Sequence, residues 1–233
     1  MRRIAFVVAA VVAVASPVFA QDTKDEKKDD KKNEKEKPSA ADLALAKKLE
    51  RQKVTFKLDG TPFAEVVDMM RDLCSVDFVI DGPAQDVVDA ESVTVTYNAN
   101  DATAKDCIAS FVRKANDNLA HEIWKGVVWI GTKASLEQKP EKPKVDDETR
   151  KKLDVNVKVS DTDETLADVL KSLKTQSKVT FSVAKEIDAS AIRVGLRLHD
   201  MKAADAVEVL CRLFHYSAEG KDGEVVFSPA KSK

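Results

Sequence analysis

Three cysteines and three histidines carry the side chains best suited to nucleophilic or metal chemistry. They are Cys74, Cys107, Cys211, His121, His199 and His215. Cys211 and His215 are the pair whose spacing of four places two ligands on one face of a helix. A zinc site needs three or four protein ligands, and the sequence contains no HExxH or CxxC motif. The sequence therefore predicts no metal site and no bound cofactor.

The cysteines are expected to be structural. Each falls on an apolar stripe of a predicted helix, where a buried thiol behaves as a small hydrophobic side chain. A catalytic cysteine would need an exposed, electropositive setting. In an oxidising compartment a disulfide is the alternative, and Cys74 and Cys107 are the pair within one predicted domain.

The carboxylates are the next candidates for chemistry. Asp106 and Asp205 occupy matching positions in two predicted helices, and paired acids can act as general acid and base. Asp68 and Asp168 fall on polar helix faces, which indicates solvated surface positions. The sequence has no Ser-His-Asp order, no GxSxG motif and no glycine-rich phosphate loop. We expect no catalytic residues and a non-enzymatic protein; an enzyme with an unrecognised site is the alternative.

The overall charge argues against nucleic acid as a partner. The 233 residues include 38 basic and 40 acidic side chains, a formal net charge of −2. Nucleic-acid binding depends on a basic surface, and the GxxG loop of KH-like domains is missing as well. We therefore expect protein partners.

The elements that would position these residues occur twice. Val54, Phe56 and Leu58 alternate with polar residues as in a strand, residues 63–74 have helical apolar spacing, and residues 77–80 return as a strand. Thr61 is predicted to cap the helix, with Pro62 in its first turn. Adding 103 to each number recovers the same strand, helix and strand. We interpret this as duplication of one domain.

The second part of each copy matches with an offset of 99. Strands at 93–97 and 192–198 precede apolar helices starting at 104 and 203. Each copy then ends in a hairpin, turning at Lys125-Gly126 in the first and through residues 220–223 in the second. The prediction is an α+β fold of two tandem β-α-β-β-α-β-β modules, at 39–132 and 154–229.

The remaining segments are predicted from composition. Residues 1–20 have the basic start, short apolar run and Val18-Phe19-Ala20 cleavage site of a signal peptide; an uncleaved anchor is the alternative. Residues 21–38 form a charged disordered tether, and residues 40–51 a short helix. Residues 133–153 form an extended, water-exposed linker whose last turn, from 146, can be helical, so we expect modules with few mutual contacts. Residues 230–233 are a polar tail.

Both copies resemble a known domain. The first contains VTFKLDGTPFAEVVDMMRDLCSVDFVID, VTVTYNANDATAKDCIASFVRKAN and VVWIGT, and the second contains VNVKVSDTDETLADVLKSL and IRVGLRLHDMKAADAVEVLCRLF. These segments resemble the short N-terminal domain shared by secretins and TonB-dependent receptors. The resemblance implies a periplasmic protein-docking module in which two helices pack between small sheets. Because the second copy is followed only by the polar tail, we expect a free-standing double module without a barrel domain.

These observations lead to one expected function. The chain is predicted to be an exported adaptor of the periplasm or cell envelope, periplasmic or secreted, with no stable membrane span after signal removal. An accessory role in a secretion or outer-membrane transport system is the alternative. Trp129 alternates with Val127 and is expected on the core face, while Trp124 is the candidate partner contact.

Overall fold

The computed structural model describes residues 37–138, 140–159 and 164–230. Residues from Lys37 onward belong to one compact unit. The predicted signal peptide, residues 21–36 of the predicted tether and residues 231–233 of the predicted tail lie outside the described residues. No helix in the described part of the chain is long and apolar enough to cross a membrane.

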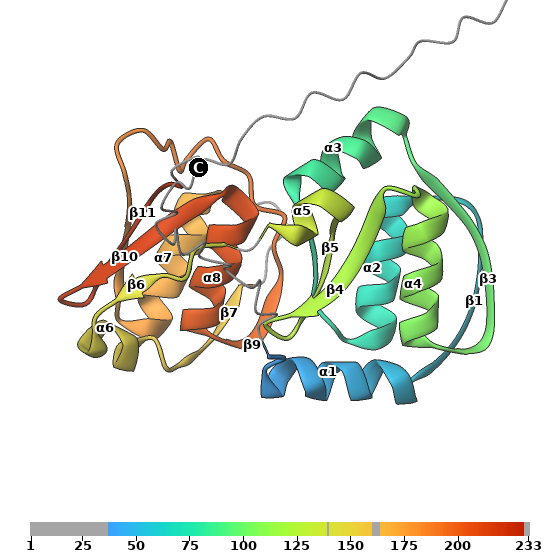
Figure 1. Cartoon of the computed structure of the whole chain (residues 1–233), viewed down its shortest axis with the longest axis horizontal. Helices are drawn as coiled ribbons and strands as arrows, with labels where there is room; N and C mark the ends of the chain where they lie inside the picture. The colour runs from blue at the N-terminus through green and yellow to red at the C-terminus, as the bar shows by residue number, and fades with distance from the viewer. Residues whose placement is uncertain (1–36, 139, 160–163, 231–233) are drawn as a thin grey trace, which may run out of the picture. The chain divides into compact units, whose positions relative to one another are not determined.

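The first half, residues 37–138, alternates helices and short strands (Figure 1). Its elements are α1 (Ala40–Arg51), β1 (Lys53–Pro62), α2 (Phe63–Cys74), β2 (Phe78–Ile80), α3 (Gly82–Glu91), β3 (Thr94–Thr103), α4 (Ala104–Ala115), β4 (Leu119–Trp124), β5 (Val127–Thr132) and α5 (Lys133–Glu137).

The second half, residues 140–230, has a similar order. Its elements are β6 (Lys144–Val145), α6 (Asp147–Lys152), β7 (Asn156–Val159), α7 (Leu166–Ser177), β8 (Thr180–Val183), β9 (Leu198–Lys202), α8 (Ala203–Phe214), β10 (Tyr216–Lys221) and β11 (Glu224–Pro229). Helices and small sheets together confirm the predicted α+β class.

Strand pairing follows the same scheme in each half. In the first, β1 pairs with β3, and a second sheet has the order β2-β5-β4. In the second, β7 pairs with β9, and the larger sheet has the order β6-β10-β11-β8. The hairpins β4-β5 and β10-β11 are antiparallel. The second strand of each hairpin also pairs with a parallel strand, β5 with β2 and β11 with β8. That the halves arose by duplication stays a prediction.

Both hairpin turns have a left-handed backbone at their two central residues, the second of which is glycine in each. Lys125 and Gly126 have φ values of 55° and 76°, and Asp222 and Gly223 have 54° and 81°. Positive φ at both central positions gives the twist that a two-residue hairpin needs. The first predicted turn is confirmed. The second is tighter than predicted, because Gly220 and Lys221 belong to β10.

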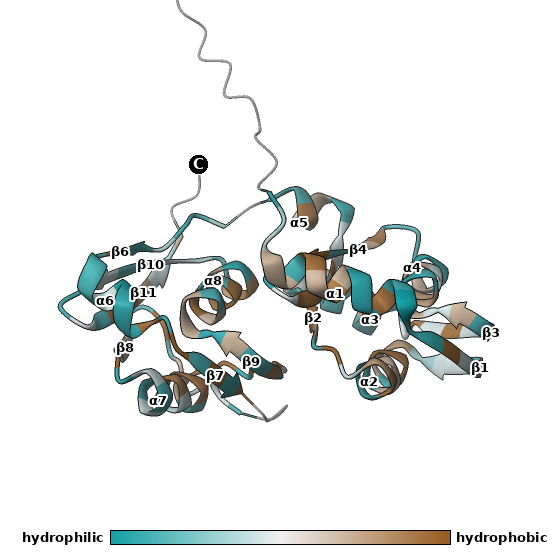
Figure 2. Cartoon of the chain, turned by 90° about the horizontal axis from the view of Figure 1, so that it is seen from below, coloured by the Kyte–Doolittle hydropathy of each residue, from teal (hydrophilic) through white to brown (hydrophobic). Residues whose placement is uncertain are grey.

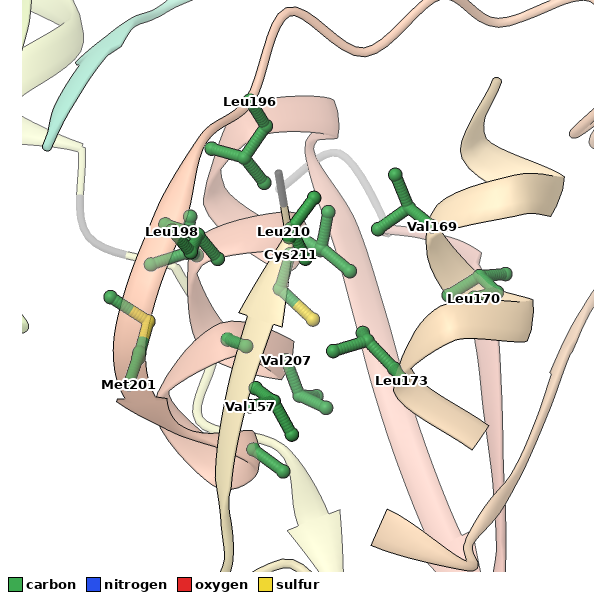
Figure 3. Packing of buried hydrophobic residues seen from close by; sticks show 14 of the residues in the cluster. Val157, Val169, Leu170, Leu173, Leu196, Leu198, Met201, Val207, Leu210 and Cys211 are labelled. Atoms are coloured by element: carbon green, nitrogen blue, oxygen red, sulfur yellow. The ribbon is translucent and has the colours of Figure 1, made fainter. Parts of the chain in front are cut away.

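Each half has its own hydrophobic core. In the first, α2 contributes Phe63, Val66 and Met70, all at most 1% exposed. In the second, Val169 and Leu173 of α7 face Val207 and Leu210 of α8 around Val157 of β7 (Figure 3). By contrast, Figure 2 shows that the residues of α6 and β6 are mostly hydrophilic. The amphipathic spacing in the sequence therefore predicted these helices correctly.

Several local predictions are wrong. Pro62 itself is the N-cap of α2, without a side-chain cap, so Thr61 does not serve as one. Helix α3 was not predicted, and residues 192–197 form only an isolated bridge through Arg193 to Thr165. The segment predicted as an extended linker contains α5, β6 and α6, of which only the α6 turn was anticipated.

Candidate functional site

Strand β5 is buried on both faces, and this determines what surrounds the tryptophans. Val128 and Ile130 pack into the core of the first half. Val127 and Trp129 point the other way and belong to the core of the second half, together with Val79 of β2. The β2-β5-β4 sheet therefore lies with its outer face against the second half. This close packing differs from the few mutual contacts that we expected between the modules.

Trp124, the predicted partner contact, lies at the edge of this packed face. Its ring meets that of Trp129 edge-on, with centroids 5.5 Å apart. The guanidinium carbon of Arg212, from α8, lies 4.8 Å from the Trp124 ring centre and 4.5 Å from that of Trp129. Trp124 is only partly buried, and it packs against the core of the second half. Contact with an external partner stays a prediction.

Two sets of ion pairs hold the same face in place. The Arg212 side chain is 7% exposed, and its Nη1 lies 2.6 Å from Oε1 of Glu122 on β4. The Nζ of Lys125, at the hairpin turn, lies 2.9 Å from both Asp205 and Glu208 on α8. Burial lowers the pKa of Lys125, but hydrogen bonds to these two carboxylates outweigh it and raise the pKa above its usual value.

A third contact joins the halves beside a groove. The carboxylate of Asp77, before β2, accepts the backbone N–H of His199 at 2.6 Å and lies 2.7 Å from that residue's Nδ1. The groove has a volume of about 990 Å³ and is lined by α1, the α2–β2 turn and β9. Two of the side chains that line it, Lys125 and His199, are already engaged in these contacts.

The three cysteines are buried. Cys74, Cys107 and Cys211 are free thiols, each at most 1% exposed. Burial raises the pKa of Cys74 to about 11 and that of Cys211 to about 12, and it also raises that of Cys107. Thiols of this kind are poor nucleophiles, because the thiolate is the reactive form.

The histidines and aspartates do not converge on one site. His121 lies on β4, where burial lowers its pKa, and His215 follows the end of α8. Asp106 and Asp168 hydrogen-bond the residues that cap α4 and α7, Asp68 pairs with Arg71, and Asp205 pairs with Lys125. No group of three or more potential metal ligands occurs among the residues that the structure describes.

Sequence reasoning missed Arg212 and Glu122. The signal was present, because Arg212 interrupts the apolar pattern of the helix at 203–214 and Glu122 stands two residues before Trp124. Arg212 and Glu122 pair because of how the two halves pack, and the apolar periodicity of the sequence does not predict that packing. No family profile, curated protein or solved structure matches the chain. The resemblance described above therefore rests on sequence pattern alone.

Proposed function

We propose that this chain is a non-enzymatic adaptor of the periplasm or cell envelope, and that its first half docks an extended segment of a partner protein onto strand β4. Two observations support this function: the secretory features of the N-terminal sequence, and the position of β4 as the last strand of its sheet among the residues that the structure describes. Edge strands carry unpaired backbone groups, and adding a strand to such an edge is a recurrent mode of protein recognition.

The observation that best supports docking at β4 is the direction in which the backbone groups of β4 and β5 point. Val128 N donates to Asp77 O, and Ile130 O accepts from Asp81 N, so these groups of β5 face β2. The intervening residues, including Trp129, therefore face β4. Trp129 is paired with Glu122, and alternation along β4 leaves the N–H groups of His121 and Ile123 directed away from β5.

The matching edge of the second half is covered. Strand β6 pairs in parallel with β10 at Glu219 and Gly220, and Asp146 N donates to Gly220 O at 3.0 Å. In Figure 1 β6 lies beside β10, whereas β4 is the last strand of its sheet. This difference supports a division of roles in which the first half docks the partner and the second half supports it.

The test is capture of partners from envelope fractions with the mature protein and edge variants. His121→Pro removes an N–H directed away from β5, so we expect partner affinity to fall about tenfold or more while circular dichroism stays unchanged. Val183→Pro is the matched control. Thr180 N and Ala184 N donate to β11, so by alternation the Val183 N–H also points away from its sheet, in the other half.

A second measurement does not require the proline variant to fold. In the unaltered protein, partner binding should slow hydrogen exchange of the amides in 119–124 and leave those in 180–183 unchanged. Unchanged affinity of a folded His121→Pro protein, or no protection of 119–124, would refute docking at β4.

A further inference from the structure

The outer edge of β3 is a second surface at which this chain can bind a strand. The β1-β3 sheet has two strands among the described residues, so no further strand of that part of the chain pairs with β3. In Figure 1 this sheet lies at the end of the first half that is remote from the second half. The edge belongs to a different sheet from β4, so the inference below does not depend on the proposed function.

The direction of the backbone groups of β3 follows from the hydrogen bond just before the strand. Val93 O accepts from Phe63 N at 3.0 Å, so the backbone groups of Val93 face the side on which α2 and β1 lie. Alternation along the strand then directs the groups of every second residue away from β1. Pro62, which has no N–H to donate, lies opposite the first of these residues, Thr94, in agreement with this direction. The residues directed outward are Thr94, Thr96, Asn98 and Asn100, and all four are exposed.

The corresponding edge in the second half is covered. Strand β9 has the same place in its two-stranded sheet, and Asp101 and Asp200, 99 positions apart, both have a left-handed backbone, with φ values of 50° and 54°. The residue before Asp200 is His199, whose N–H donates to the carboxylate of Asp77 in the first half at 2.6 Å. Asn100, the residue before Asp101, makes no contact of this kind within the part of the chain that the structure describes. The edge that is covered in the second half is therefore open in the first.

The two edges of the β1-β3 sheet differ in their residue types. On the β1 edge, Lys57 and Pro62 are directed outward, because they lie opposite Asn98 and Thr94. Lysine and proline on an edge strand are two of the means by which proteins prevent strands from pairing. Residues 94–100 of β3 include no charged residue and no proline. The residue types therefore oppose pairing at the β1 edge and permit it at the β3 edge.

We propose that the outer edge of β3 pairs with the same edge of a second copy of this chain, antiparallel about a two-fold axis at Tyr97. A two-fold axis brings one surface against itself, so that surface must be self-complementary. The uncharged segment 94–100 meets this requirement, because its self-pairing places no like charges opposite each other. Thr96 then lies opposite Asn98 of the other copy, and Thr94 opposite Asn100. Each of these pairs exchanges two main-chain hydrogen bonds.

Sedimentation equilibrium of the mature protein tests for this dimer. We expect the unaltered protein to pass from monomer to dimer as its concentration rises. Asn98→Pro removes an outward N–H and should raise the dissociation constant of the dimer about tenfold or more. Lys57→Pro is the matched control, because Lys57 lies opposite Asn98 and its N–H is directed outward at the other edge of the same sheet. This control should leave the dissociation constant unchanged.

Hydrogen exchange of the unaltered protein locates the contact whether or not the variants fold. Exchange of the Thr96 and Asn98 amides should slow as the protein concentration rises, and exchange of the Lys57 amide should not. The proposal is overturned if the protein stays monomeric at millimolar concentration, or if folded Asn98→Pro and Lys57→Pro proteins associate equally. Protection of amides in 119–124 instead would assign the dimer contact to β4 and also overturn it. A monomer that binds an extended peptide at 94–100 would exclude a second copy as the occupant.

Discussion

The guanidinium of Arg212 lies over the ring of Trp129, with its central carbon 4.5 Å from the ring centre. Arg212 belongs to α8 in the second half and Trp129 to β5 in the first, so this contact joins residues 83 positions apart in the sequence. Stacking of this kind stabilises by roughly 0.5–2 kcal/mol, more when the groups are withdrawn from water.

Replacing Arg212 tests the contribution of this contact. Arg212→Met keeps much of the apolar volume but removes the stacking and the pair with Glu122, so we expect a loss of about 1–2 kcal/mol in the free energy of unfolding. Urea unfolding followed by tryptophan fluorescence measures it. Arg113→Met is the matched control: Arg113 is the exposed residue 99 positions earlier, on α4. Its loss should be below about 0.5 kcal/mol, and equal effects of the two changes would contradict the prediction.

Separating the two halves should also lower the thermal stability of each. A fragment of residues 37–138 exposes Val79, Val127 and Trp129, which are at most 1% exposed in the whole chain. We expect each fragment to have a lower thermal midpoint than the full chain, and 37–138 mixed with 140–230 to regain part of the difference. Calorimetry of the separate and mixed fragments measures this. Fragments as stable as the full chain would instead support the independent modules expected from the linker composition.

Asp42 is expected to stabilise the first half. Its carboxylate accepts Ser39 N as part of the α1 capping box and also accepts Gly126 N at 2.8 Å. Asp42→Ala removes both bonds but leaves the Ser39 cap, and a hydrogen bond to a charged group contributes roughly 1.5–3 kcal/mol. Glu50→Ala, at the other end of α1, breaks an ion pair whose side chains are both 53% exposed, so it should lower the free energy of unfolding much less than Asp42→Ala does. Urea unfolding of both variants separates the two effects.

The buried thiols should make the protein sensitive to alkaline pH. The pKa of Cys211 is raised from 9.0 to about 12, so folding favours the protonated thiol. This contribution to stability is fully present below pH 9 and is lost as the pH rises towards 12. Thermal midpoints measured from pH 8 to 11 should fall, and they should fall less steeply in Cys211→Ala, which cannot ionise there. Parallel slopes for the two proteins would show that other groups dominate.

The mature chain should begin at Gln21. The basic start, short apolar run and small residues before the cut predict signal-peptidase cleavage. Mass spectrometry of the native protein identifies the first residue. Recovery of residues 1–20 in a membrane fraction would instead indicate an uncleaved anchor.

Local features were predictable from the sequence because they depend on neighbouring residues. The helical spacing at 63–74 and 104–112 and the Lys125-Gly126 turn specify α2, α4 and the first hairpin without reference to distant segments. A helix stripe or a turn is determined within a few residues, so alternation and turn chemistry suffice. The fold class followed from the order of these elements.

What the tertiary structure alone decided is how these elements meet. Alternation placed Trp129 on a buried face, but only packing shows that this face is covered by the second half. The pairing of β6 with β10 and the sharing of Arg212 between Glu122 and two tryptophan rings join segments distant in sequence. Such contacts depend on the shape and charge of two assembled surfaces, and a periodic pattern along one chain segment carries no information about its partner across the interface.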